Sequence, residues 1–444
     1  MPRHLDESHD PGATSWVESA SAAEGDFPLQ NLPFGVFRRR AVARESRVGI
    51  AIGDRIVDVC ACLEAGLLAG ESTRAAEACA AAGMDGLLSL GPAGWSALRR
   101  RVSALLRRGH PDEARHRASL GPRLIPMAEV DLLLPADIGD YTDFYASIFH
   151  AANVGRMLRP DNPLLPNYRW VPIGYHGRAS SLVVSGTPIR RPRGQTKADG
   201  ADAPVFGPSR RLDYELEVGA LVGPGNQLGR PVTVSEAEDH VFGLCLVNDW
   251  SARDMQAWEY QPLGPFLAKS FATSLSPWIV TLEALEPYRV PPLVRPAGDP
   301  APLPYLDDEI GRERGGFGLV LEVYLQTARM REIGMAPVRL SRGSFRDMYW
   351  TVAQLVAHHT SNGCNLRPGD LIASGTVSGA DPDSRGCLLE LACRGQNPIA
   401  LPSGETRAFL EDGDEVVLRG FCVAPGRPRI GFGECCGRVE PAAS

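Results

Sequence analysis

The sequence lacks the features of exported, membrane-spanning and nucleic-acid-binding proteins. It has no run of 18 apolar residues, and its first 20 residues are polar, without the apolar segment of a secretion signal. Ten cysteines in 444 residues are too few for a disulfide scaffold, and no two are spaced as Cys-x-x-Cys. The formal net charge is -7, with no concentrated positive segment. We therefore expect a cytoplasmic protein with neither a membrane nor a nucleic acid as partner.

Lysine is almost absent as well. Of 46 basic residues, only Lys197 and Lys269 are lysine. Arginine and lysine are not interchangeable at tight sites, so a retained lysine is a candidate for a position that needs a compact ammonium. Lys269 lies in the apolar stretch GPFLAKSF and fits this interpretation, whereas Lys197 lies in the polar loop RGQTKADG, where its retention can be chance.

The short motifs of several common enzyme classes are also missing. The sequence contains no phosphate-binding P-loop and no dinucleotide fingerprint. It has neither the G-x-S-x-G nucleophile elbow of α/β-hydrolases nor the H-E-x-x-H pair of zinc proteases. The usual signatures of nucleotide binding, serine hydrolysis and zinc proteolysis are therefore absent.

Composition and pattern indicate a mainly β, α+β protein with two domains. Glycine (47) and proline (37) are abundant, which predicts many turns. We expect a disordered leader over residues 1–25, an N-terminal domain with a hairpin and helices over 26–130, and a strand-rich C-terminal domain over 131–444. One strong helix is predicted at about 345–359.

Acidic residues alternate with apolar ones in the stretch LDYELEVG, which predicts a strand with Asp213, Glu215 and Glu217 on one face. If that face looks outward, it is only a solvated surface. Strand signals on both sides favour a sheet interior, where like charges two residues apart need a counter-cation. Asp249, which ends the run VFGLCLVND, and Asp143 in DYTDFY add further oxygen ligands. Such a set favours magnesium or calcium over zinc.

His150 lies seven residues after Asp143, which is two turns along one face if the segment is helical. A hydrogen-bonded histidine of the core is one interpretation of this position. The other is a general base near a metal, a role that suits imidazole at neutral pH.

Four long segments resemble the fumarylacetoacetase (fumarylacetoacetate hydrolase) family. They are DYTDFYASIFHAANVG (140–155), VPIGYHGRASSLVVSGTPIRRPRGQ (171–195), LVNDWSARDMQAWEYQPLGPFLAKSF (246–271) and NGCNLRPGDLIASGT (362–376). The likeness extends from FPLQNLPFGVF at Phe27 to RIGFGECCGRV near the end. The leader and the proline-rich loop around 288–316 lie outside it.

The resemblance implies a small N-terminal barrel of the SH3 type, followed by a C-terminal mixed β-roll that carries the active site, in a homodimer. It implies that Mg²⁺ and/or Ca²⁺ is bound, with a ligand set consisting of Asp143, Glu215, Glu217 and Asp249, assisted by Lys269 and Thr273. Phe149 and Ala268 stand where relatives often carry other residues.

The resemblance also implies the catalytic roles. His150 is the catalytic histidine, and Glu390, in a predicted strand CLLELACRG, orients it. Arg253, Gln256 and Lys269 are the groups that stabilise a leaving carbanion. The implied substrate contacts are Tyr145, Arg159, Tyr175, Gln256, Tyr260 and Thr376.

The implied reaction is hydrolysis of the carbon–carbon bond of the diketo acid 4-fumarylacetoacetate to fumarate and acetoacetate, which ends tyrosine and phenylalanine catabolism. Two alternatives remain open. One is another metal-dependent keto-acid enzyme of the superfamily, such as an acylpyruvate hydrolase, a decarboxylase or a hydratase, although these relatives are shorter. The other is a non-catalytic homologue, which would have no need for His150, Glu390 and the four acids.

Overall fold

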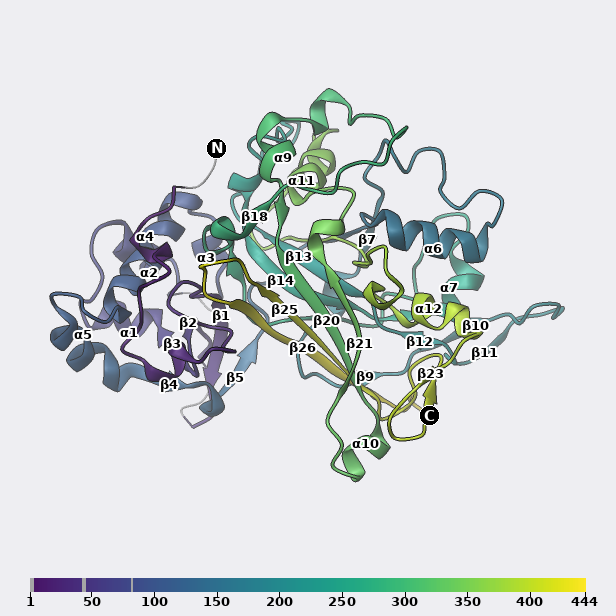
Figure 1. The fold of residues 1–444 in the computed structure, drawn as a ribbon, viewed down its shortest axis with the longest axis horizontal. Helices are drawn as coiled ribbons and strands as arrows, with labels where there is room; N and C mark the ends of the chain where they lie inside the picture. The colour runs from purple at the N-terminus through teal and green to yellow at the C-terminus, as the bar shows by residue number, and fades with distance from the viewer. Residues whose placement is uncertain (1–3, 42–44, 81–82) are drawn as a thin grey trace.

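The computed structural model describes residues 4–41, 45–80 and 83–444. A small N-terminal part lies beside a larger, strand-rich C-terminal part (Figure 1). Strands form two extended sheets in the C-terminal part and one in the N-terminal part, where helices contribute to the core as well. The predicted mainly β, mixed α+β fold class with a separate N-terminal domain is therefore confirmed.

The N-terminal part is built on a five-stranded antiparallel sheet in the order β4-β3-β2-β1-β5. Its strands are β1 (Phe34–Arg39), β2 (Arg47–Ile52), β3 (Arg55–Asp58), β4 (Leu124–Pro126) and β5 (Val130–Leu133). The hairpin expected in the N-terminal domain is β2–β3, and Gly53 takes the positive φ of its turn. The helices that pack beside the sheet include α1 (Val59–Glu64), α2 (Glu71–Glu77), α4 (Pro92–Leu106) and α5 (Glu113–Leu120).

Two sequence-based boundaries differ from the structure. Strand β5 pairs with β1, so the N-terminal sheet extends past residue 130, where the boundary was expected. Residues 4–25, expected to be disordered, are ordered and include two short 3₁₀ helices, Glu7–His9 and Glu18–Ser21. The Trp16 indole donates to the carbonyl of Leu105 at 2.9 Å, so a buried aromatic anchors this polar segment. Residues 1–3 lie outside the described residues.

The C-terminal part contains an eight-stranded mixed sheet that holds most of the chemistry. Its main path is β7-β6-β22-β13-β14-β16-β8, and β17 (Val280–Thr281) also pairs with β14. The strands are β6 (Tyr141–Phe144), β7 (Gly174–Gly177), β8 (Leu182–Val184), β13 (Leu216–Val222), β14 (Val241–Asp249), β16 (Thr273–Leu275) and β22 (Leu371–Ala373). All nine residues of β14 are buried, because both faces of this central strand are covered.

A second, five-stranded sheet packs against the first in the order β21-β20-β25-β26-β9. Its strands are β9 (Ile189–Arg190), β20 (Leu319–Gln326), β21 (Val338–Ser344), β25 (Glu415–Cys422) and β26 (Ile430–Glu440). Close approach requires glycine at one point, because a Cβ on Gly437 would lie 2.6 Å from the Trp250 ring. The side chains between the two sheets belong to one continuous core.

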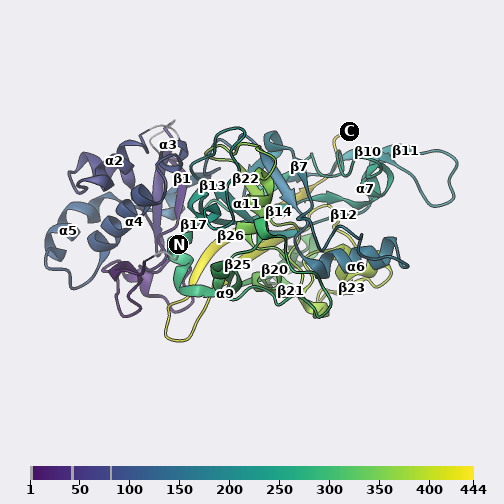
Figure 2. The same ribbon diagram turned by 90° about the horizontal axis from the view of Figure 1, so that it is seen from above.

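The remaining elements surround the eight-stranded sheet. They include α6 (Ile148–Leu158), α7 (Arg253–Glu259), α11 (Val352–Thr360), α12 (Leu388–Leu391), β12 (Leu212–Asp213) and β15 (Ser251–Ala252). The β10–β11 hairpin (Arg193–Thr196 and Val205–Pro208) projects from the end of the molecule farthest from the N-terminal part (Figure 2). Within the described ranges, no helix is long and apolar enough to cross a membrane.

Two predicted elements are corrected by the structure. The helix expected at 345–359 begins only at Val352, because Thr351 and Gln354 form a capping box there. The stretch CLLELACRG, expected to be a strand, instead forms helix α12. The Asp213 carboxylate accepts hydrogen bonds from the backbone N–H groups of Leu388 and Leu389, which supports the first turn of this helix.

Candidate active site

Four acidic side chains converge at one end of the eight-stranded sheet. Asp143 lies on β6, Glu217 on β13 and Asp249 at the end of β14, while Glu215 directly precedes β13. One oxygen of each lies within 4.8 Å of the others, and all four residues are buried. The structure thus brings together the four acids that the sequence predicts as a metal site.

Asp213 does not join this cluster, contrary to the expectation of one acidic strand face. The chain leaves the strand conformation between β12 and β13. The Asp213 carboxylate instead binds Arg253 Nε at 2.9 Å and the backbone of α12. It is therefore a structural acid beside the cluster.

The four carboxylates are only partly neutralised by protein cations. The Lys269 ammonium lies 2.9 Å from Asp249 Oδ2 and also pairs with Glu215. Arg253 Nη1 lies 2.7 Å from Glu215 Oε1. Burial by itself would raise the pKa of Glu215. The cationic Lys269 and Arg253 outweigh this effect, so the pKa of Glu215 is lowered. Two of the four negative charges are therefore compensated.

The other two carboxylates, those of Asp143 and Glu217, form no ion pair with a lysine or arginine among the described residues. Burial and the neighbouring acids raise the pKa values of Asp143 and Glu217 well above their ordinary range. Both oxygens of Glu217 are buried without a hydrogen-bond partner. An unpartnered buried carboxylate is costly, and a divalent cation would satisfy it and balance the remaining charge. The donor set therefore fits a hard, oxygen-preferring ion.

Strand pairing orients these ligands. Asp143 pairs in register with Tyr175, and Asp249 pairs with Thr273. The hydroxyls of Tyr175 and Thr273 donate to opposite oxygens of Asp249, at 2.6 Å and 2.8 Å. The Tyr175 hydroxyl, expected to contact substrate, is thus engaged with a cluster acid.

His150 and Glu390 form a buried pair next to this cluster. Ser147 caps helix α6 and accepts a hydrogen bond from the His150 N–H at 3.2 Å, which places His150 in the first turn. His150 Nδ1 lies 2.6 Å from Glu390 Oε2. Since a carboxylate only accepts, this contact assigns the proton to Nδ1 and leaves the lone pair of Nε2 free.

Glu390 is held as an anion by several donors. Besides His150, Asn153 donates to Oε1 at 2.8 Å, and Ser378 donates to Oε2 at 2.8 Å. The Cys387 thiol lies 3.2 Å from the same Oε2. Burial opposes ionisation, but the neighbouring His150 and these hydrogen bonds lower the pKa of Glu390 to about 2.

Helix α7 brings further polar groups to the cluster. Arg253 Nη1 donates to Gln256 Oε1 at 3.1 Å, and Tyr260 caps the C-terminus of the helix. Arg253 Nη2 is buried and has no hydrogen-bond partner among the residues that the structure describes. The cation predicted to stabilise a leaving group therefore retains a free donor.

The other residues predicted to contact the substrate each have a defined environment in the structure. The Tyr145 ring lies 5.3 Å from the His150 ring in an edge-to-face arrangement. Thr376 Oγ1 and Arg159 Nε are buried, and within the described part of the chain neither has a hydrogen-bond partner. Phe149, where relatives differ, packs against the hydrophobic core and does not alter the His150 contacts. Unsatisfied buried donors are rare in folded proteins and suit groups that await a ligand.

Three residues of this site have no signal in the sequence. Asn153, Ser378 and Cys387 are separated by up to 234 positions along the chain, yet all contact Glu390. Each is an ordinary polar or thiol side chain in its local context. Cys387 lies three residues before Glu390, whereas the fold brings Asn153 and Ser378 to it.

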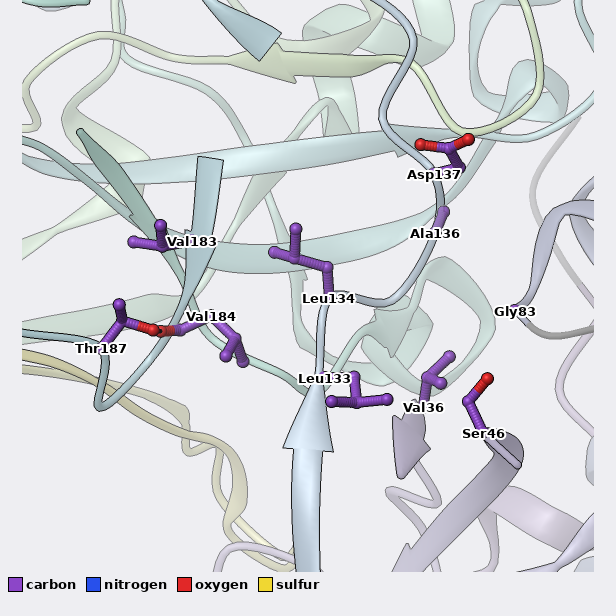
Figure 3. Close-up of a pocket in the computed structure, with 10 residues that line it drawn as sticks. All are labelled: Val36, Ser46, Gly83, Leu133, Leu134, Ala136, Asp137, Val183, Val184 and Thr187. Atoms are coloured by element: carbon purple, nitrogen blue, oxygen red, sulfur yellow. Dashed lines mark hydrogen bonds between the residues drawn. The ribbon is translucent and has the colours of Figure 1, made fainter. Parts of the chain in front are cut away.

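A cavity outside this site has a different character. It has a volume of about 460 Å³ and lies between the two domains, among apolar side chains such as Leu133, Val183 and Val184 (Figure 3). Asp137 is the only charged residue among the described ones that line it. It offers no group for acid–base chemistry apart from this one carboxylate.

Two family models together match nearly the whole chain. The model described as "Fumarylacetoacetase N-terminal" matches residues 30–135, and the model described as "Fumarylacetoacetate (FAA) hydrolase C-terminal" matches residues 141–440. These ranges divide the chain between β5 and β6, which agrees with the strand pairing described above.

Curated relatives match over almost their full length. The fumarylacetoacetase of Arabidopsis thaliana is 47% identical over 421 residues, which cover 95% of this chain and 97% of that protein. The fumarylacetoacetase of Homo sapiens is 48% identical over 426 residues, with 95% and 98% covered. A solved structure of an HpcE protein from Mycobacterium smegmatis shares the fold at a TM-score of 0.51 and 20% identity, covering 92% of this chain and 99% of that chain.

Proposed function

The chain belongs to the fumarylacetoacetase family, and we propose that its acid cluster and its His150–Glu390 pair together hydrolyse the carbon–carbon bond of 4-fumarylacetoacetate. The products would be fumarate and acetoacetate, as in the last step of tyrosine and phenylalanine catabolism. The 2.6 Å contact between His150 Nδ1 and Glu390, beside four converging acids, is the observation that carries the proposal.

The residues that would hold a divalent ion are Asp143, Glu215, Glu217 and Asp249, and we propose Mg²⁺ or Ca²⁺. The orphaned oxygens of Glu217 and the all-oxygen donor set support this choice. When bound, such an ion supplies Lewis acidity, which polarises the diketone oxygens and spreads the charge of the enolate that leaves. Lys269 and Thr273 hold the ligands Glu215 and Asp249 in place.

His150 is proposed as the general base. With the proton on Nδ1 directed at Glu390, the lone pair of Nε2 can accept a proton from water as the oxygen attacks the carbonyl carbon. The ionised Glu390 then stabilises the imidazolium that forms. A positioned base of this kind typically contributes about 10² to 10⁴ in rate.

Arg253, Gln256 and Lys269 are proposed to stabilise the leaving carbanion. All three lie on α7 or shortly after it, and Arg253 keeps Nη2 free of other partners. Donors fixed in place before the reaction need no reorganisation, and one such donor can contribute about 3 to 4 kcal/mol. Lys269, clamped by two acids, is fixed in this sense.

Substrate recognition is assigned to the groups that line the same region. Arg159 suits a terminal carboxylate of the diketo acid, because guanidinium groups bind carboxylates with paired hydrogen bonds. The remainder of the substrate molecule would contact Tyr145, Tyr260 and Thr376. The unpartnered hydroxyl of Thr376 supports this role for Thr376. Tyr175 acts on the substrate only indirectly, by fixing Asp249.

We further propose a homodimer that works in the cytoplasm. The projecting hairpin and the loop after α7 expose Phe206, Leu263 and Phe266, and Leu263 is 97% exposed. Large exposed apolar side chains in neighbouring segments are typical of association surfaces. All ten cysteines are free thiols, which suits a reducing compartment.

Neither alternative function is favoured. The match of the N-terminal family model over residues 30–135 disfavours the shorter keto-acid enzymes of the superfamily. The retained His150–Glu390 pair disfavours a non-catalytic homologue.

The proposal is tested by incubating the purified protein with 4-fumarylacetoacetate and identifying the products by NMR. Equimolar fumarate and acetoacetate would support it. Turnover of acylpyruvates with none of 4-fumarylacetoacetate would refute it in favour of a related keto-acid enzyme.

A further inference from the structure

Ser378 connects both members of the catalytic pair, although it touches neither the acids nor the predicted substrate contacts through a side-chain hydrogen bond. We propose that Ser378 is a positioning residue, which fixes Glu390 and, through it, the His150 ring. This inference rests on the proposed function, because it assigns to Ser378 a role in the same proton transfer.

The direction of the Ser378 hydroxyl is determined by its two partners. The backbone N–H of Gly386 donates to Ser378 Oγ at 2.9 Å. A hydroxyl has one hydrogen, and with Oγ accepting from Gly386, that hydrogen is directed at Glu390 Oε2, 2.8 Å away. Ser378 therefore acts as a fixed donor to the oxygen that also receives the His150 proton.

The backbone of Ser378 anchors the other member of the pair. Its carbonyl accepts a hydrogen bond from Ser147 Oγ at 2.9 Å. The same Ser147 oxygen caps α6 by accepting the N–H of His150. The backbone of Ser378 thus positions the helix that carries His150, while its side chain positions Glu390.

The groups that hold Ser378 lie in the protein interior. Ser378 and Glu390 are both fully buried. The carbonyl of Gly386 also accepts a hydrogen bond from the N–H of Leu216, which lies between the ligands Glu215 and Glu217. A Cβ on Gly386 would lie 2.3 Å from the carbonyl oxygen of Val377, so the two backbone segments approach too closely here for any residue but glycine. Ser378 therefore lies between the backbone that carries Glu215 and Glu217 and the His150–Glu390 pair.

Removal of the hydroxyl should reduce the rate of the chemical step without weakening substrate binding. We expect Ser378→Ala to lower kcat at least about tenfold, a part of what a positioned general base contributes, while KM changes by less than about threefold. The affinity of Ser378→Ala for Mg²⁺ should match that of the wild type, because Ser378 contacts none of the four cluster acids. Ser378→Cys keeps a weaker donor in nearly the same volume and should be intermediate in kcat.

Ser341→Ala is the matched control. Ser341 is also a buried serine of the same domain, but its hydroxyl has no hydrogen-bond partner among the described residues. Its removal should leave kcat, KM and metal affinity unchanged.

A double-mutant cycle separates positioning from general damage to the fold. If Ser378 acts through Glu390, then Ser378→Ala should cost little in a Glu390→Ala background, because the group that it positions is already gone. Effects on kcat that multiply in the double mutant would overturn the proposal, as would wild-type kcat in Ser378→Ala.

Failure of the inference can be distinguished from failure of the proposed function. If Glu390→Ala lowers kcat strongly but Ser378→Ala and Ser378→Cys do not, only the role of Ser378 is wrong. If Glu390→Ala itself retains wild-type kcat, then the catalytic pair is wrong and the positioning role with it. Should Ser378→Ala fail to fold, a wild-type kcat in the isosteric Ser378→Cys would still overturn the proposal.

Discussion

Lys269 and Asp249 form a buried ion pair, with Nζ 2.9 Å from Oδ2. The same ammonium pairs with Glu215, and only 6% of the Lys269 surface is exposed. Burial opposes the charge, but the two carboxylates hold the pKa of Lys269 above its ordinary value. One of the only two lysines in the sequence, whose other basic residues are arginines, thus lies between two proposed metal ligands.

Lys269→Arg should lower kcat at least about tenfold, or about 1.4 kcal/mol of transition-state stabilisation, because a planar guanidinium is too wide for this gap. Lys197→Arg is the control, since Lys197 lies on the projecting hairpin, 5.2 Å from the Trp258 ring. Steady-state kinetics that follow the ultraviolet absorbance of the diketone compare the two. Wild-type kinetics in both variants would show that the retained ammonium has no special role.

His150→Ala should abolish hydrolysis while the protein still binds its metal. The histidine is hydrogen-bonded to Glu390 and is not one of the four clustered acids. Isothermal titration with Mg²⁺ and a turnover assay on the same preparation test the two halves of this statement. Turnover close to that of the wild type would contradict the assignment of the general base.

Glu217→Gln should weaken metal affinity more than any substitution at a surface acid. Both Glu217 oxygens are buried without other partners, so a neutral amide removes a ligand charge that nothing replaces. Glu434→Gln, at a half-exposed ion pair with Arg419, is the matched control. Equal Mg²⁺ affinity in wild type and Glu217→Gln would place the ion elsewhere.

Acid should remove the contribution of Glu390 to stability. Its pKa is lowered in the folded protein from an ordinary 4.5 to about 2, chiefly because the interaction with His150 outweighs burial. A depressed acid stabilises the fold above its unfolded pKa, and this stabilisation is lost as the pH falls through the folded pKa. The difference in unfolding free energy between wild type and Glu390→Gln should therefore shrink between about pH 5 and about pH 3. Urea titrations measure it, and a difference that stayed constant would contradict the assigned cause.

Much of the site could be predicted from the sequence because its ligands lie on strands. Alternation placed Glu215 and Glu217 on one face, and the apolar run before Asp249 marked a buried strand. The resemblance supplied Glu390, which has no local signal. Asp213 was placed wrongly because the chain turns after β12, and alternation cannot reveal such a break.

Other features depended on contacts between distant segments. The apolar content of CLLELACRG suits a strand, yet Asp213, 175 positions away, supplies the hydrogen bonds that support a helix there. The polar leader has no periodic pattern, yet it is fixed by contacts such as that of Trp16 with Leu105. Two partners of Glu390 likewise come from other segments, Asn153 from 237 positions away and Ser378 from 12. Tertiary contacts decided these elements, and local propensity carried no information about them.

The most direct test of the account is the hydrolysis of 4-fumarylacetoacetate by the purified protein before and after exhaustive chelation. We predict rapid loss of the diketone absorbance in the untreated protein, none after chelation, and recovery on addition of Mg²⁺ or Ca²⁺. Full activity of the metal-free protein would contradict the role of the four-acid cluster, and a metal-loaded protein that leaves the substrate intact would contradict the function itself.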